Sequence, residues 1–129
     1  MANTESKDIR IFDTITKTFA NAIPLAGTPW SAVWSQDERA LFVPMQSPDE
    51  IAVVDASTGS LLRHRAFGTD CEKPHEAVFS SDRSTLYVTC EGDHAGPSAI
   101  LAIDPNTLET RTTLPVGVYP DRLAVLGLP

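Results

Sequence analysis

The run IAVVD at residues 51–55 recurs in closely similar form as IRIFD at residues 9–13 and as ILAID at residues 100–104. The starts of the three runs lie 42 and 49 residues apart. Each run leads, 20 or 23 residues after its start, to a proline, and these prolines are Pro29, Pro74 and Pro120. Periods of this length indicate repeated supersecondary units.

Each unit consists of short β-rich runs separated by polar turns, and no window of eleven or more residues sustains a helical apolar stripe. The unit that begins at Pro74 has predicted strands at residues 75–79, 85–90, 99–103 and 109–116. The preceding unit has predicted strands at residues 30–34, 40–43, 51–54 and 61–67, and a further strand is expected at 121–126. Together with the strands around residues 9–13, this predicts an all-β chain of roughly ten strands.

Apolar side chains occur on both faces of these strands. In the strand that starts at His75, Ala77 and Phe79 point one way while Val78 points the other. A sheet that neighbouring sheets cover on both faces has this pattern. Four-stranded antiparallel sheets of this size, stacked face to face, are the blades of a β-propeller. We therefore expect a partial β-propeller.

Each of the three repeated runs ends in Asp, followed three residues later by Thr. An Asp side chain accepts hydrogen bonds from nearby backbone N–H groups and thereby holds a turn. The pattern therefore predicts a structural role for Asp13, Asp55 and Asp104.

The bulk properties exclude some functions. The net charge is −7 and the ten basic residues are scattered, which argues against nucleic-acid binding. No apolar run approaches the ~18–20 residues that span a bilayer. Residues 1–8 lack the hydrophobic core of a secretory signal, so a complete chain would be expected in the cytoplasm.

The run LYVTC at residues 86–90 follows the pattern Pro74-x-x-x-Val78-x-Ser80-x-Asp82. Together they resemble the YVTN repeat of seven-bladed β-propellers, a group that includes surface-layer and lactonase-like propellers. The repeat ends in Val-Gly and Pro, which this chain has as Val116-Gly117 and Pro120. The resemblance covers residues 3–129, with Asn3 matching the end of a strand whose beginning is missing.

The sequence departs from this repeat in two ways. The turns that normally contain Asp-Gly read Asp37-Glu38 and Asp82-Arg83. The strand at residues 40–43 runs into Pro44, which cannot donate a hydrogen bond in a β-ladder.

We expect residues 1–8 to form an N-terminal stub and residues 9–129 to form the propeller repeats, with units that meet near residues 29, 74 and 120. These repeats are too few for a closed ring, which needs ~4–8 blades. The expectation is the C-terminal part of a larger propeller. The alternative is a homo-oligomer in which the last strand of one copy completes the first blade of another.

The two cysteines fall at one end of the third unit. Pairing of residues 75–79 with 85–90 sets Pro74 opposite Cys90, so a Cys71–Cys90 disulfide is geometrically reasonable. The resemblance implies a periplasmic or extracellular location, which would permit this bond. Two free thiols or a Cys/His zinc site are the alternatives. No paired C-x-x-C is present, and we predict no metal site and no cofactor.

The densest polar cluster lies on the loops at this same end. The candidate ligand-binding residues are His75, Glu76, Glu91, Asp93 and His94. A packing role for His75 at the mouth of a blade is the competing interpretation, and Trp30 and Trp34 fit packing between blades. The sequence has neither a Gly-x-Ser-x-Gly elbow nor a Gly-rich phosphate loop, so no catalytic residues are predicted.

The resemblance implies a non-enzymatic binding or interaction scaffold for a protein or small molecule, because propellers bind partners on their loop-rich ends. A lactonase-like hydrolase and a propeller that binds a haem-type cofactor are the alternatives. Fold alone does not choose among them.

Overall fold

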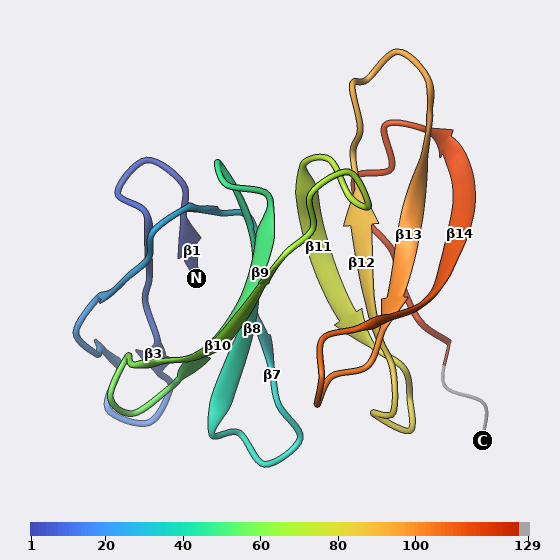
Figure 1. Cartoon of the computed structure of the whole chain (residues 1–129). Coiled ribbons are helices and arrows are strands. Elements are labelled where there is room, and N and C mark those ends of the chain that lie inside the picture. Colours follow the sequence, from blue (N-terminus) through green and yellow to red (C-terminus); the bar gives the residue numbers. More distant parts are fainter. Residues whose placement is uncertain (127–129) are drawn as a thin grey trace.

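The computed structural model describes residues 1–126, so residues 127–129 of the predicted repeat segment lie outside it. Within these 126 residues the secondary structure is strand and turn, with no helix. The strands form antiparallel sheets in three layers that follow one another along the chain (Figure 1). The predicted all-β arrangement of propeller blades is confirmed.

The third blade has the four strands that the sequence predicts. They are β11 (Pro74–Phe79), β12 (Leu86–Cys90), β13 (Pro97–Ile103) and β14 (Thr110–Val118). Each strand pairs with the next in antiparallel fashion, from β11 on the inside to β14 on the outside.

The middle blade differs from the prediction at its inner strand. The predicted strand at residues 30–34 is confirmed only at its end, because two short strands, β6 (Thr28–Pro29) and β7 (Val33–Trp34), both pair with β8 (Ala40–Gln46). The outer strands agree with the prediction and are β9 (Glu50–Asp55) and β10 (Leu61–Ala66).

A β-bulge separates β6 from β7. The register shifts by one residue between Pro29 and Val33, and β11 shifts at the corresponding place, between Pro74 and Ala77. Pro44 lies opposite the first bulge and accepts the Trp30 N–H through its carbonyl at 3.3 Å. The N and C=O of a strand residue point to the same side, so the missing N–H of Pro44 faces the bulge. For this reason β8 continues past Pro44 instead of ending there.

The first blade consists of short strands. They are β1 (Ala2–Asn3), β2 (Asp8–Ile9), β3 (Phe12–Asp13), β4 (Thr18–Phe19) and β5 (Ile23–Pro24). β2 pairs with β1 and β5, and β3 pairs with β4. Their order in the chain matches the middle and outer strands of a four-stranded blade. Among residues 1–126 no inner strand pairs with β1 to complete this blade.

The predicted strand at residues 121–126 is wrong, since this segment forms no strand. It contacts the third blade through side chains instead, because no second strand lies beside it to complete a ladder. Glu76 Oε2 accepts the Leu123 N–H at 2.8 Å, and the Asp121 carbonyl accepts from the Thr89 hydroxyl at 3.3 Å.

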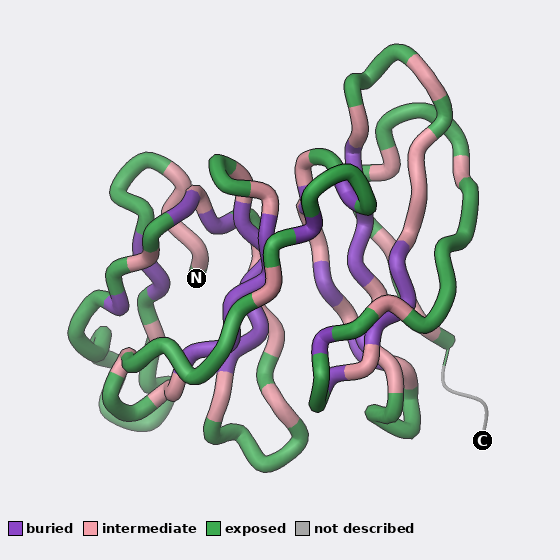
Figure 2. The backbone as a smooth tube through the Cα atoms, viewed as in Figure 1, coloured by how far each residue is buried: buried purple, intermediate pink, exposed green. Residues whose placement is uncertain are grey.

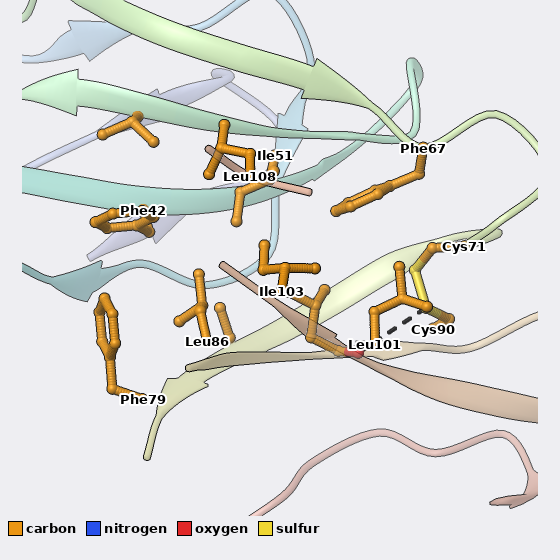
Figure 3. Close-up of a cluster of buried hydrophobic side chains, with 13 residues drawn as sticks. Phe42, Ile51, Phe67, Cys71, Phe79, Leu86, Cys90, Leu101, Ile103 and Leu108 are labelled. Atoms are coloured by element: carbon orange, nitrogen blue, oxygen red, sulfur yellow. Dashed lines mark hydrogen bonds between the residues drawn. A yellow bond between two sulfur atoms is a disulfide. The ribbon is translucent and has the colours of Figure 1, made fainter. Parts of the chain in front are cut away.

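The core lies between the blades. Alternate residues of β8 enter different layers: Leu41 and Val43 pack toward the first blade, and Phe42 packs toward the third. In Figure 2 the buried residues follow the middle of each sheet, whereas the loops at both ends are exposed. The layer between the middle and third blades is drawn in Figure 3, where the Phe42 and Phe79 rings meet edge to face at 5.3 Å.

Aspartates hold the turns as predicted. Asp13, Asp55 and Asp104 each accept backbone N–H groups two and three residues ahead. These hydrogen bonds keep the pKa of each carboxyl below its usual value, for Asp55 at about 2, where the Ser57 hydroxyl contributes most. Glu38 and Arg83, where the YVTN repeat has Gly, adopt positive φ angles of 56° and 60°.

Replacement of Leu101 by Ala tests the layer between the blades. Leu101 is 0% exposed, so we expect a loss of about 2–5 kcal/mol in the free energy of unfolding. Leu114→Ala on neighbouring β14 is the matched control, because Leu114 is 41% exposed and should cost less than about 1 kcal/mol. Urea denaturation measures both. Equal losses in the two variants would contradict this account of the core.

Acid stability tests the turn at Asp82. The Ser80 hydroxyl, the Ser84 N–H and the Ser84 hydroxyl donate to this carboxylate and lower its pKa to about 2. A carboxyl whose pKa falls on folding stabilises the fold above its unfolded pKa, and this contribution disappears as the pH falls from about 4 to 2. We expect Asp82→Asn to be less stable at pH 7 and to lose less stability over that range. Parallel stability curves for wild type and variant would count against this role.

Candidate functional site

The candidate site lies at the start of the inner strand of the third blade. His75 occupies the bulge at the beginning of β11, where two residues oppose one. The Thr89 hydroxyl accepts the Glu76 N–H at 2.9 Å and replaces the missing ladder bond. Bulges often turn side chains toward functional sites. Here the side chain of His75 is 12% exposed and meets two carboxylates.

Glu91 forms the centre of the cluster. Its side chain is 5% exposed, and its two oxygens face two imidazole rings. Oε1 lies 3.3 Å from Nε2 of His75, and Oε2 lies 2.9 Å from Nε2 of His94. The Glu91 N–H donates to the Lys73 carbonyl at 3.0 Å, which fixes the backbone beside the end of β12.

Asp121 completes the cluster from the segment that follows the third blade. Its Oδ1 lies 3.2 Å from Nδ1 of His75, and its main-chain oxygen lies 3.0 Å from the same atom. His75, Glu91 and Asp121 each offer one ligand atom within 4.8 Å of the others. The sequence interpretation missed Asp121, although it directly follows Pro120 as His75 follows Pro74.

Trp30 occupies the same repeat position in the middle blade, directly after Pro29. Its ring lies 4.8 Å from the ring of His75 between centroids. Trp30 is 41% exposed, so it contacts the neighbouring blade while keeping one side open. The residues that follow the three landmark prolines, Trp30, His75 and Asp121, therefore lie side by side across the blades.

Two of the five predicted candidates have other contacts. Glu76 joins blades by accepting the Leu123 N–H, as Ser31 Oγ accepts the Ala77 N–H at 3.2 Å. Asp93 holds its own loop, since the N–H groups of Ala95 and Gly96 donate to it at 2.9 Å and lower its pKa. The structure thus brings together His75, Glu91 and His94 of the predicted set.

The predicted disulfide is present between Cys71 and Cys90, with a Cα–Cα distance of 5.1 Å. Figure 3 shows it at one end of the layer between the middle and third blades. It ties the segment before β11 to the end of β12, immediately before Glu91. Because both sulfurs are bonded to each other, the alternatives of free thiols and of a Cys/His zinc site are wrong.

The Thr89 hydroxyl, which is nearest along the chain to Glu91, already accepts the Glu76 N–H and donates to the Asp121 carbonyl.

Within residues 1–126 no helix is long and apolar enough to cross a membrane.

The sequence matches no protein-family model and no curated protein. In structure the chain is similar to hydrazine synthase of Kuenenia stuttgartiensis, with a TM-score of 0.78, 22% identity, and coverage of 92% of this chain and 32% of that one. It is also similar to the dihydro-heme d1 dehydrogenase NirN in complex with DHE, with a TM-score of 0.71 and 16% identity. The match covers 90% of this chain and 25% of that one.

A third similar structure is AztD of Citrobacter koseri, with a TM-score of 0.65, 15% identity, and coverage of 92% of this chain and 32% of that one. All three are β-propeller proteins, and the chain spans a third of their length or less. At these identities the likeness shows the fold alone.

Removal of the disulfide tests its contribution to the fold. The cysteines are 19 residues apart, and closing a loop of this size stabilises a protein by about 3 kcal/mol. We expect the Cys71→Ser/Cys90→Ser double variant to lose about that much free energy of unfolding, measured in urea. In parallel, the wild-type chain unfolded without reductant should show no reactive thiols. Detection of two thiols per chain would contradict the assignment.

Proposed function

We propose that this chain is a segment of a YVTN-type β-propeller that serves as a non-enzymatic binding and interaction scaffold. The observation that carries the proposal is the row formed by Trp30, His75 and Asp121 on successive blades. Each residue follows a landmark proline at the inner position of its repeat, and the inner strands of a propeller surround its central channel. Side chains at this position would line the mouth of that channel, where ligands of ring-shaped proteins bind.

Neither alternative function has a specific observation in its favour. Both ring nitrogens of His75 face oxygen atoms of Glu91 or Asp121 within 3.3 Å, so a haem would have to displace one of these residues before its iron could reach the imidazole. A similar structure is named for dihydro-heme d1, and this keeps a haem-type ligand as an alternative for this chain. A lactonase-like hydrolase would need an activated water, and its assignment would rest on fold analogy.

The disulfide supports a location in an oxidising compartment such as the periplasm or the cell exterior. Disulfides form and persist there and are rare in the cytosol. The bond between Cys71 and Cys90 is buried, with both residues 1% exposed, and it therefore has a structural position.

The blades at the two ends of the described chain are complementary. The first blade has middle and outer strands, and residues 121–126 occupy an inner-strand position without a second strand. Apolar side chains are exposed at both ends, among them Phe12 at 47% and Leu126 at 84%. We propose that further blades cover these ends, supplied by the rest of a larger propeller or by a second copy. Two copies would make six blades, within the ~4–8 that close a ring.

Light scattering on a sizing column tests the ring. The chain has a mass of 13.9 kDa, so a six-bladed ring of two copies would appear at about 28 kDa. Leu123→Asp should disrupt such a ring, because Leu123 lies in the segment that would complete the partner's first blade. Leu62→Asp is the matched control, since Leu62 is 55% exposed on the outer strand β10.

The possible outcomes separate the two sources of blades. A discrete dimer that Leu123→Asp dissociates would show a ring made of copies. Heterogeneous association of the wild-type chain would indicate blades supplied by another polypeptide. A monodisperse monomer at micromolar concentration would refute the scaffold assembly, because the end sheets would then be stable in water.

A further inference from the structure

The side chain of His75 presents both ring nitrogens to oxygen atoms that can accept hydrogen bonds. Nε2 faces Glu91 Oε1 at 3.3 Å, and Nδ1 faces the Asp121 main-chain oxygen at 3.0 Å and its Oδ1 at 3.2 Å. A neutral imidazole has a single N–H, so it satisfies one of these two sides. The other side requires either a second proton or a cation between nitrogen and oxygen.

The charges around His75 favour a cation. Two carboxylates converge on the ring, and the one from Glu91 is almost fully buried. Burying an ionised carboxylate is costly unless an opposite charge compensates it. Apart from the two histidines, the basic side chain paired with this cluster among residues 1–126 is Arg122, whose Nε lies 3.8 Å from Asp121 Oδ2 and whose side chain is 79% exposed. A divalent cation would neutralise both carboxylates inside the cluster.

The donor set indicates which cation fits. Imidazole together with carboxylate suits zinc and similar first-row transition metals, whereas magnesium and calcium prefer oxygen donors alone. Zinc–ligand bonds of about 2.0–2.1 Å at tetrahedral angles separate neighbouring ligand atoms by about 3.3 Å. His75 Nε2 and Glu91 Oε1 are already 3.3 Å apart.

We propose that His75, Glu91 and Asp121 bind a divalent transition-metal ion, with zinc as the representative. The ion would replace the proton between His75 Nε2 and Glu91 Oε1. The Asp121 carboxylate, whose Oδ1 lies beside Nδ1, would turn toward the ion and supply the third protein ligand. A fourth position would remain for water or another ligand. This inference rests on the proposed function, because it names the class of ligand at the same channel mouth.

The surrounding contacts have the form that supports a metal ligand. A metal-binding histidine usually donates its other ring N–H to a carbonyl or carboxylate. Nδ1 of His75 has such a partner in the Asp121 main-chain oxygen. His94 would donate from Nε2 to the remaining Glu91 oxygen at 2.9 Å, and the Trp30 ring contacts the face of His75. His94 and Trp30 are thus positioning residues.

The chain supplies its own control. Glu50 and His64 form another histidine–carboxylate pair, with His64 Nδ1 at 3.1 Å from Glu50 Oε2 and Glu50 7% exposed. This pair belongs to no group of three potential ligands among the described residues. It therefore matches the burial and pairing of Glu91 without the third ligand.

Isothermal titration of the folded 129-residue chain with Zn²⁺ tests the site, with thermal unfolding as a second measurement. We expect one ion per chain, micromolar or tighter affinity, and a higher Tm with zinc. Asp121→Asn and Glu91→Gln should each weaken binding at least tenfold, while Glu50→Gln leaves it unchanged. Co²⁺ bound in place of Zn²⁺ should quench the fluorescence of Trp30, and Trp30→Phe should reduce this quenching.

Several results would overturn the proposal. These are the absence of saturable binding at one ion per chain, undiminished binding in Asp121→Asn, or an equal loss in Glu50→Gln. Asp121 lies outside the strands and is exposed, so its variant remains informative even if Glu91→Gln fails to fold. Zinc titration and light scattering are independent measurements. A monomer that binds zinc would refute the ring and support the metal site. A ring that binds no zinc would support the ring and refute the metal site.

Discussion

A sheet that is apolar on both faces is stable only between two other sheets, and the rest of this structure depends on that constraint. In β8 and β9 every residue from Leu41 to Val43 and from Ile51 to Val54 is buried, with successive side chains in opposite layers. The middle blade has a neighbour on each side. The two outer blades have one, and they carry exposed apolar side chains such as Phe12 and Leu114. Repetition is therefore a physical requirement of this chain.

The interruption of the inner strands is what creates a place for polar chemistry. At the bulge two residues oppose one, so a side chain there is released from the alternation that commits its neighbours to the apolar layers. Trp30 and His75 occupy this position in successive blades. The next position is Ser31 or Glu76, and its side chain accepts a backbone N–H from the start of the following repeat, which fixes the two repeats relative to each other. Fold and site thus share the same few residues of the repeat.

Much of this could be predicted from the sequence, because repeats are visible as periods and strands as alternation. The blades, the aspartate turns and the Cys71–Cys90 bond follow from the register of the landmark prolines. The broken inner strand could not be foreseen, since the predicted strand at residues 30–34 is too short for the one-residue shift in alternation at a bulge to be recognised. The segment at 121–126 has a strand-like sequence and forms no strand, because a strand also needs a partner.

The candidate site was likewise predictable from the sequence only in part. His75 and Glu91 were found because they are close in a predicted hairpin. Asp121 lies outside that hairpin, 46 residues from His75, and only the stacking of consecutive repeats brings the two side chains together. Glu91 is nearly fully buried and contacts both imidazole rings, and no sequence pattern shows such contacts.

His75 and Asp121 are 46 residues apart and belong to consecutive blades, so the cluster straddles a boundary between two repeats. Anything that binds to both sides of such a boundary holds the repeats at one angle, and by reciprocity the angle sets how well it binds. Occupancy of the cluster and closure of the ring would then be thermodynamically linked. In that case the cluster would act as a sensor of whether the following blade has docked.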